Sequence, residues 1–361
     1  MTAPEIAERL AEGRPVRIAG GGTRRGWGRP VEAGDEVSTA GLGAIVEHSR
    51  GDFTAILEAG VKVADAQAAF AEAGQMWAVD PPMLPGATIG GLVATADSGP
   101  RRHRYGPPRD LIIGAEVALS DGTVAKAGGK VIKNVAGYDL AKLMAGAFGT
   151  LGVITRVSVR LHPLPEATAT AVFQSGEPEE LGRIAADLAH RPFELDALDV
   201  RYAGGEGAIL ARFAGATAAQ QARELVDDGA QVVEDDEALW EAQRAGQRGE
   251  APAAVVRVSA LQTELPDVLR AADVVGARVV GRAGAGVAYV TLPLADAEAV
   301  RTLRAELDPA ACVVLDAPQE LRAALDPWGV PDGPELELAR RVKARFDPAG
   351  VCNPGIFIGG I

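Results

Sequence analysis

The sequence predicts an α+β protein with two domains, and three observations lead to this prediction. The chain has 361 residues, which is enough for two domains that each bury a core. Hydrophobic residues make up 47% of it and aromatic residues only 4%, which indicates folded domains with aliphatic cores. Glycine-rich segments follow expected strands in the first half, whereas strands and helices alternate after the prolines at positions 163 and 165. We expect domains at residues 1–165 and 166–325 and a C-terminal segment at 326–361.

Apolar periodicity and turn residues predict the elements of the first half. The first helix carries Ile6 and Leu10 on one face, and a later helix carries Leu140, Leu143 and Met144 on one face. The expected helices are residues 4–12, 63–73 and 139–145, and the expected strands are residues 14–19, 55–59, 114–119, 123–127 and 153–161.

The second half predicts an antiparallel sheet that helices cover on one side. Its expected strands are residues 170–173, 208–213, 253–259 and 287–292. Its expected helices are residues 178–188, 218–226, 265–272 and 295–307, and a last helix follows at 334–346. No repeat of fixed period is visible, although this half could hide a weak duplication.

Charge and composition exclude several classes of function. The formal net charge of −13 argues against nucleic-acid binding, which needs Lys and Arg to neutralise phosphates. A local basic cluster, Arg101 to Arg104 with His103, is either a solvated loop or a contact for an anion or a partner. Two cysteines are too few for a disulfide framework, and Glu5 and Glu8 lie where a signal peptide would be apolar. The low cysteine count fits a reducing cytosol, so we expect a cytoplasmic protein. No apolar run of 18 residues occurs, so we expect no membrane span.

Three glycine-rich segments carry the candidate chemistry. The first contains Gly20, Gly21, Gly22 and Thr23 directly after an expected strand, where several backbone N–H groups can converge on one phosphate. Taken alone, this segment could also be a plain tight turn. The segment is not the dinucleotide motif G-x-G-x-x-G, because Arg25 occupies the place of the third glycine. The four histidines of the chain form no metal-binding motif.

The second segment begins at Pro85 and includes Thr88, which we expect to cap a short helix. The N–H groups of Ile89, Gly90 and Gly91 would then point outward from a helix N-terminus, a favourable place for a pyrophosphate. Alternatively, these glycines only allow close helix packing. The remaining candidates in this segment are Gly86, Ala87, Thr95, Ser98 and Gly99.

The third segment contains Gly149, Thr150, Gly152, Val153 and Ile154 and combines a tight turn with the start of a strand. Its backbone groups could hydrogen-bond a flat ring or a ribose, or the segment could be an ordinary β-turn. Three such loops in one small domain, each next to a strand end, together indicate a dinucleotide site.

These segments resemble the FAD-binding domain of the p-cresol-methylhydroxylase type, in the vanillyl-alcohol-oxidase superfamily. The resemblance rests on residues 20–23, 85–99, 105–106, 121–122, 149–155 and 346–355. Residues 133–139 and 146–152 are more specifically similar to the E subunits of bacterial glycolate oxidases. The implied fold is a two-part FAD-binding domain with a cap of antiparallel sheet and helices, and the C-terminal tail would return to the first domain.

The resemblance also implies where the cofactor would lie. FAD would place its pyrophosphate against residues 20–23 and 86–91, with Ser98, Gly99, Gly106, Gly152 and Ile154 nearer the ribose and flavin. Arg109 and Asp110 would form a structural or cofactor-proximal pair, and Asn353 would return to the flavin side. Arg109 and Lys133 could stabilise reduced flavin or be surface ion pairs, and Tyr138 could contact substrate or pack at a helix start.

Two departures from the family pattern shape the expected function. Covalent members carry a histidine just after the first glycine loop, where this chain has Thr23 and two arginines, so we expect non-covalent FAD. Related dehydrogenases hold a metal with paired histidines in the cap, whereas this cap offers only His190, so we expect no metal and assign no catalytic residue.

The expected function is an FAD-dependent oxidoreductase subunit that oxidises a small 2-hydroxy acid, foremost glycolate, with a second flavin subunit and an iron–sulfur subunit as partners. One alternative is a flavin-bearing electron-transfer or assembly subunit without turnover of its own. Another is a free-standing FAD-linked oxidase for a different alcohol.

Overall fold

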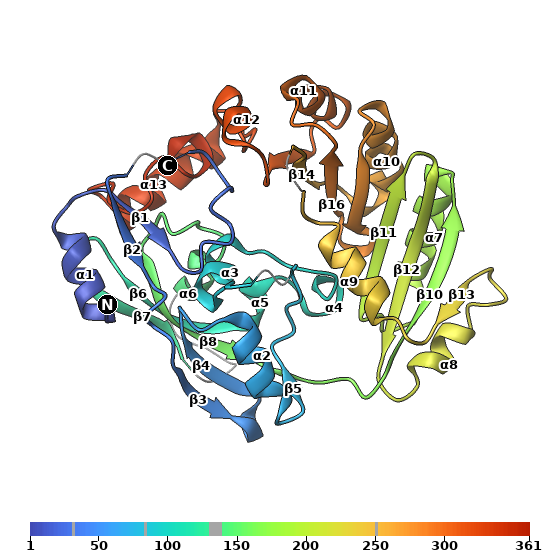
Figure 1. The fold of residues 1–361 in the computed structure, drawn as a ribbon, viewed down its shortest axis with the longest axis horizontal. Coiled ribbons are helices and arrows are strands. Elements are labelled where there is room, and N and C mark those ends of the chain that lie inside the picture. The colour runs from blue at the N-terminus through green and yellow to red at the C-terminus, as the bar shows by residue number, and fades with distance from the viewer. Residues whose placement is uncertain (31–32, 83–84, 130–138, 250–251) are drawn as a thin grey trace.

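A five-stranded antiparallel sheet and its helices form the first half of the structure, a computed structural model that describes residues 1–30, 33–82, 85–129, 139–249 and 252–361 (Figure 1). The strand order is β3-β4-β8-β6-β7. These strands are β3 (Ile45–Ser49), β4 (Thr54–Glu58), β6 (Ile112–Ala118), β7 (Val124–Gly128) and β8 (Val153–Arg160). Two small sheets accompany them, one of β1 (Val16–Ala19) with β2 (Asp35–Ser38) and one of β5 (Gln75–Met76) with β9 (His162–Pro163).

The helices of the first half are short, and most begin where the sequence predicts. They are α1 (Ala3–Ala11), α2 (Val63–Ala71), α3 (Ile89–Thr95), α4 (Arg102–Tyr105), α5 (Pro108–Leu111) and α6 (Leu140–Met144). Ile6 and Leu10 of α1 are fully buried, as expected for the apolar face of this helix. The prediction that Leu140, Leu143 and Met144 form the buried face of α6 is wrong. Ala141 and Met144 are buried, whereas Leu140 and Leu143 are exposed. In a helix of five residues, two positions three apart are enough to contact the core.

The second half is a single eight-stranded antiparallel sheet that contains an internal duplication. Its strand order is β13-β10-β12-β11-β15-β16-β14-β17. The first repeat consists of β10 (Thr168–Ser175), α7 (Pro178–His190), β11 (Ala197–Ala203), β12 (Glu206–Ala214), α8 (Ala218–Arg223) and β13 (Gln231–Val233). The second consists of β14 (Ala254–Ser259), α10 (Leu265–Val274), β15 (Arg278–Arg282), β16 (Val287–Leu292), α11 (Ala297–Glu306) and β17 (Ala311–Val314).

Each repeat therefore has the order β-α-β-β-α-β, and in each the fourth strand lies beside the first and the third beside the second. The two repeats join edge to edge where β11 pairs with β15, with Val200 opposite Gly281. The duplication that the sequence only suggested is thus explicit in the topology.

Helices cover one face of this sheet, as expected, with one departure. Residues of α7, α8, α10 and α11 pack into the large core on that face. The additional helix α9 (Glu237–Ala245) packs on the other face, where Trp240 contacts Val172 and Leu210. The rest of this inner face turns toward the first half, so the first half and α9 together occupy it.

The C-terminal segment returns to the first half, as the resemblance implied (Figure 1). It contains α12 (Gln319–Ala324) and α13 (Pro334–Phe346). Cys352 forms a parallel bridge with Val16 of β1, and Lys343 Nζ donates to the carbonyl of Thr150 over 2.7 Å. The exact domain boundaries remain a prediction. Among the described residues, no helix is long and apolar enough to cross a membrane.

Candidate functional site

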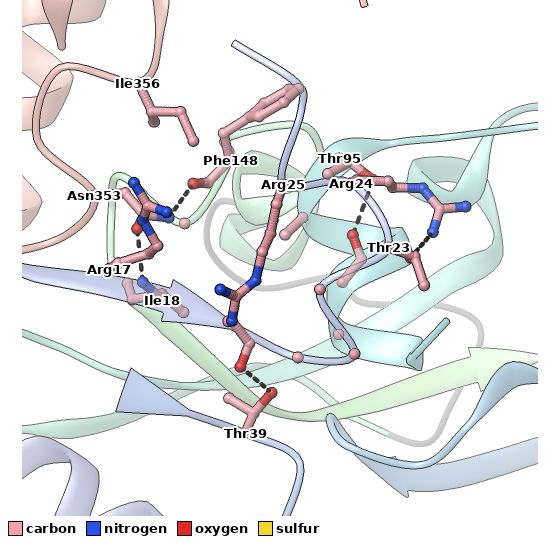
Figure 2. Close-up of a pocket in the computed structure, with 18 of the residues that line it drawn as sticks. Arg17, Ile18, Thr23, Arg24, Arg25, Thr39, Thr95, Phe148, Asn353 and Ile356 are labelled. Atoms are coloured by element: carbon pink, nitrogen blue, oxygen red, sulfur yellow. Dashed lines mark hydrogen bonds between the residues drawn. The ribbon is translucent and has the colours of Figure 1, made fainter. Parts of the chain in front are cut away.

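A cavity of about 560 Å³ lies between β1, α3, the turn at residues 148–152 and the C-terminal tail (Figure 2). This volume is typical of a small-molecule site. The cavity brings together members of all three glycine-rich segments and the tail. The predicted site residues that line it are Gly20, Gly21, Gly22, Thr23, Thr88, Gly90, Gly91, Thr95, Gly149, Gly152, Ile154 and Asn353.

The first two glycine segments contact each other directly, and only glycine permits this contact. A Cβ atom at Gly20 would lie 2.2 Å from Thr88 Oγ1, and one at Gly21 would lie 1.6 Å from the carbonyl oxygen of Gly86. These distances are far shorter than a van der Waals contact. The glycines at positions 20 and 21 therefore have a packing role in addition to any contact with a ligand.

The amides at the start of α3 do not point into the cavity as predicted. Thr88 caps the helix as expected, and its hydroxyl accepts from Gly91 N over 3.3 Å. Ile89 N donates to Val61 O over 2.9 Å, and Gly90 N donates to Ala59 O over 2.8 Å. The expectation that these three N–H groups bind a pyrophosphate is therefore wrong, because protein acceptors already use them.

The first turn retains free donors. Among the described residues, no protein acceptor takes a hydrogen bond from the backbone amide of Gly21, Gly22 or Thr23. Gly22 has a φ of +70°, which glycine adopts without strain and which turns successive N–H groups to one side. Backbone donors without a protein partner need water or a ligand, so this turn has donors available to a molecule in the cavity.

The charge of the cavity lining is opposite to that of the chain. Five arginines line it, namely Arg17, Arg24, Arg25, Arg29 and Arg322, and no carboxylate does so among the described residues. Burial lowers the pKa of the Arg322 guanidinium, and the nearby charge of Arg17 lowers it further. Arg24, Arg25 and Arg29 pair with Asp97, Glu36 and Asp326 behind the lining. The surface that faces the cavity still presents guanidinium groups and no carboxylate among the described residues, which favours an anionic ligand such as a diphosphate.

The third segment is held by the tail through Asn353. Ile18 N donates to Asn353 Oδ1, and Asn353 Nδ2 donates to the Phe148 carbonyl, both over 2.7 Å. A Cβ at Gly149 would lie 2.8 Å from Asn353 Nδ2, so glycine is needed beside this amide. Asn353 therefore fixes the turn at residues 148–152 against β1 and forms one wall of the cavity (Figure 2).

The other predicted site residues do not line the cavity, and several have protein contacts that explain their identity. These residues are Pro85, Gly86, Ala87, Ser98, Gly99, Gly106, Arg109, Thr150 and Val153. A Cβ at Gly99 would lie 1.7 Å from Asp80 O, and one at Gly106 would lie 2.6 Å from Asp110 Oδ2. Arg109 and Asp110 are both exposed. Lys133 and Tyr138 lie outside the described residues.

Sequence reasoning missed the five arginines and Phe148, which also line the cavity. Arginine is common on surfaces, so nothing local marks these positions, and Arg322 reaches the cavity from the distant helix α12. Phe148 has a φ of +53° and packs against Trp328, with ring centroids 4.9 Å apart. An aromatic residue before the third glycine segment was the only local signal available.

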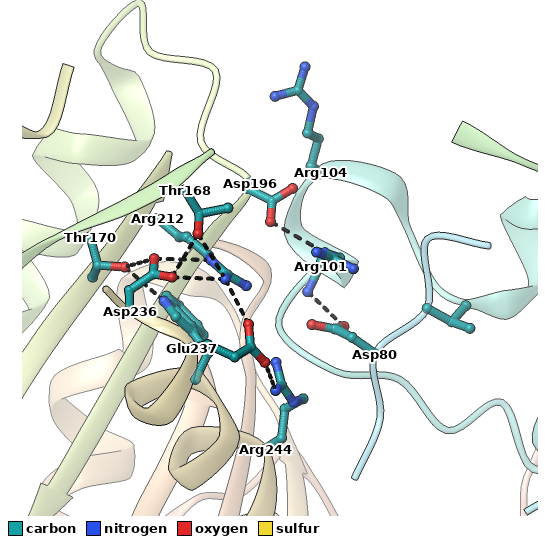
Figure 3. A network of polar contacts seen from close by, with 12 residues as sticks. Asp80, Arg101, Arg104, Thr168, Thr170, Asp196, Arg212, Asp236, Glu237 and Arg244 are labelled. Atoms are coloured by element: carbon teal, nitrogen blue, oxygen red, sulfur yellow. Dashed lines mark hydrogen bonds and ion pairs between the residues drawn. The ribbon is translucent and has the colours of Figure 1, made fainter. Parts of the chain in front are cut away.

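Ion pairs join the first half to the segment that precedes β11, and Figure 3 shows the one between Arg101 and Asp196. Arg101 Nε lies 3.4 Å from Asp196 Oδ2, and Arg104 Nη2 lies 2.9 Å from Glu194 Oε2. The backbone amide of Arg101 donates to Asp80 Oδ1 over 3.0 Å, and burial raises the pKa of Asp80 to about 6. Most of the basic cluster at residues 101–104 is thus a contact within the chain.

A second ionic contact is more deeply buried. Asp97 Oδ2 accepts from Arg24 Nη2 over 2.6 Å and from Arg248 Nη2 over 2.8 Å. Arg248 also lies 3.1 Å from Asp316 and 4.6 Å from the centre of the Trp27 ring. Arg24, which lies near the position of the histidine in covalent relatives, therefore pairs with Asp97 within the first half, and Asp97 joins the two halves through Arg248.

Histidine chemistry has little support in the cap. His190 is the last residue of α7, on the outer face of the sheet. Its Nδ1 atom lies 2.6 Å from the carbonyl oxygen of Ala186. Among the described residues, no group of three His, Cys, Asp or Glu side chains could hold a metal ion.

The comparisons with known proteins agree with this geometry. Residues 5–128 match a family described as a FAD binding domain. The solved structure of an alkyldihydroxyacetonephosphate synthase aligns over 98% of this chain and 74% of its own, with a TM-score of 0.67 and 15% identity, which shows a shared fold. The N-terminal part of the chain is therefore similar to FAD-binding domains, and this match supports FAD as the cofactor.

Two sequence relatives are subunits of glycolate oxidases. The subunit GlcE of Escherichia coli (strain K12) is 32% identical over 215 residues, which are 57% of this chain and 61% of the relative. The subunit GlcD of Bacillus subtilis (strain 168) is 37% identical over 157 residues, which are 43% of this chain and 33% of the relative. The matched regions thus cover less than two thirds of either relative.

Proposed function

We propose that this chain is an FAD-dependent oxidoreductase subunit that acts on a small 2-hydroxy acid, foremost glycolate, in a cytoplasmic complex with a second flavin subunit and an iron–sulfur subunit. The observation that carries the proposal is the arginine-lined cavity whose first turn has unused amides at Gly21, Gly22 and Thr23. The resemblance to glycolate oxidase subunits supports the substrate and the partners.

The residues of the chain divide the binding of FAD into separate tasks. The amides of residues 21–23 and the surrounding arginines would hold the diphosphate, and the turn at residues 149–154 would contact the more distant part of the dinucleotide. FAD, when bound, supplies the acceptor for the hydride that leaves the α-carbon of the substrate. Because this chain has Thr23, Arg24 and Arg25 where covalent relatives carry a histidine, the proposed attachment is non-covalent.

The experiment is anaerobic reduction of the purified, FAD-loaded chain by glycolate or D-lactate. Loss of the oxidised-flavin absorbance on mixing supports substrate turnover by this chain. Full retention of that absorbance in the absence of partner subunits contradicts it.

A second candidate function is a flavin-bearing electron-transfer or assembly subunit that turns over no substrate. Two observations favour it, namely the outward position of His190 and the packing of Trp27, Phe148 and Trp328 on the inner face of the cap. This candidate predicts that the flavin bleaches only when the second flavin subunit is added. A free-standing oxidase instead predicts peroxide production by the isolated chain in air.

A further inference from the structure

Two arginines between the halves of the molecule, Arg102 and Arg257, have no carboxylate partner among the residues that the structure describes. Four other arginines of this region each have one. The pairs are Arg24 with Asp97, Arg101 with Asp196, Arg248 with Asp316 and Arg282 with Asp199. Arg102 and Arg257 therefore bring two positive charges to the interface that form no ion pair within the described part of the chain.

Arg257 extends from the inner face of the cap sheet. Its neighbours Val256 and Val258 in β14 are in the core beneath the helices, so strand alternation turns Arg257 to the opposite face. Arg257 pairs across the sheet with Tyr289 of β16, which places their side chains next to each other. The Nε atom of Arg257 is buried and has no hydrogen-bond partner.

Arg102 approaches the same place from the first half. Its Nη1 lies 3.4 Å from Ser98 Oγ, and the Tyr289 hydroxyl lies 3.5 Å from the carbonyl oxygen of Ser98. Burial lowers the pKa of Arg102, and the positive charges of Arg257 and Arg282 lower it further. Arg102 thus lies beside Ser98, and Arg257 lies beside Tyr289, whose hydroxyl approaches the same serine.

This arrangement has the chemistry of a small-anion site. Burying part of a guanidinium group without a counter-ion costs free energy. A carboxylate that accepts hydrogen bonds from the guanidinium offsets this cost. The two nearby carboxylates of the chain, Asp199 and Asp110, do not pair with Arg102 or Arg257. Asp199 lies 2.5 Å from Arg282 Nη1, and Asp110, which attracts Arg102, is exposed and makes no ion pair with it.

We propose that Arg102 and Arg257 together bind the carboxylate of a small 2-hydroxy acid, with the Tyr289 hydroxyl beside them. The identity of the ligand rests on the proposed function, whereas the preference for a carboxylate rests on the two unpartnered guanidinium groups. The site uses one arginine from each half of the molecule, so it exists only when the two halves are packed together.

The test is calorimetric titration of the FAD-loaded chain with glycolate under anaerobic conditions, and with glycolamide as its uncharged analogue. Arg102→Gln and Arg257→Gln are each expected to weaken glycolate binding by about 10-fold to 100-fold, because each removes a charge-assisted hydrogen bond. The control Arg301→Gln changes an exposed arginine of α11 and is expected to bind as the wild type does. Glycolamide is expected to bind weakly and equally to all of them.

Flavin content and melting temperature identify variants that do not fold, and Arg257→Lys replaces Arg257→Gln in that case. Lysine keeps the charge but loses the bidentate geometry, so an intermediate affinity is expected. The proposal is overturned if both glutamine variants bind glycolate as the wild type does, if glycolamide binds as tightly as glycolate, or if the flavin-loaded wild type takes up no glycolate. A chain that binds no FAD overturns the proposed function instead, and the same titration of the flavin-free chain still decides on the two arginines.

Discussion

The side-chain amide of Asn353 donates a 2.7 Å hydrogen bond to the main-chain carbonyl of Phe148, 205 residues earlier in the chain. The same side chain accepts from Ile18 N, so it joins the tail to β1 and to the turn at residues 148–152. Asn353 is buried and has a φ of +42°, which asparagine tolerates better than most residues. One residue of the tail thus shapes the wall of the cavity.

Asn353→Ala is expected to lower the free energy of unfolding by about 2 to 4 kcal/mol, because it leaves a buried amide and a buried carbonyl without partners. FAD affinity is expected to fall as well, since the turn at residues 148–152 loses its support. Urea unfolding and FAD titration measure the two effects. Asn353→Asp keeps the acceptor for Ile18 and is expected to lie between alanine and wild type. A loss below about 0.5 kcal/mol for the alanine variant would contradict this role.

Gly21→Ala is expected to weaken FAD binding by about 10-fold or more, equivalent to about 1.4 kcal/mol. The added Cβ would lie 1.6 Å from Gly86 O, so the two turns must separate. Gly26→Ala is the matched control, because a Cβ at Gly26 meets no atom within 4 Å. Fluorescence quenching of FAD on titration gives both affinities. Equal affinity of the two variants would show that the contact between the turns does not shape the site.

Asp97→Asn is expected to destabilise the chain by about 3 to 5 kcal/mol, because it leaves the buried guanidinium group of Arg24 without a carboxylate and removes one of the two carboxylates that Arg248 contacts. The control Glu298→Gln removes one partner of an exposed pair with Arg301 and is expected to cost less than about 1 kcal/mol. Chemical denaturation followed by tryptophan fluorescence measures both. Similar small losses in the two variants would argue against a buried ionic contact between the halves.

As the pH rises from 4 to 6, the free energy of unfolding is expected to decrease because of Asp80. An ordinary ion-paired carboxylate has the opposite effect, because it stabilises the native state as the pH rises. Burial raises the pKa of Asp80 from 3.8 to about 6, so the native state keeps a proton that the unfolded chain has already lost. The stabilisation is therefore present below the unfolded pKa and disappears as the pH rises through the folded pKa. Two pKa units correspond to about 3 kcal/mol.

The variant Asp80→Asn tests this pH dependence, because it keeps the acceptor for Arg101 N but does not titrate. The difference in free energy of unfolding between wild type and variant is expected to shrink or change sign between pH 4 and pH 7. Parallel stability curves over this range would show that Asp80 has an ordinary pKa. Asp199, whose pKa burial also raises to about 6, contributes equally to both curves.

Local sequence signals predicted most helices and the strands that flank the cavity. Thr88 caps α3 because a threonine followed by small residues is a strong helix start, and the hairpin of β6 and β7 follows from the turn at residues 120–122. The strands β11 and β15 were not predicted. The five residues of β15 include Gly281, which weakens the strand pattern, and β15 is stabilised by pairing with distant strands.

The details of the site depended on contacts between residues far apart in the chain. The N–H groups of Ile89 and Gly90 were predicted to be free because their acceptors, in the segment at residues 59–61, lie about 30 residues away and have no sequence signature. Similarly, Arg322 reaches the cavity only because the tail folds back on the first half. The glycine turns could be found from sequence, whereas the charges around them required the structure.

The binding of FAD by the purified chain tests the central claim most directly. The account predicts that the wild type takes up one FAD per chain, that denaturation releases the flavin intact, and that substitution of Arg322 by glutamine weakens its uptake by about 10-fold. A chain that remains colourless and takes up no FAD at any concentration tested would contradict the assignment of the arginine-lined cavity.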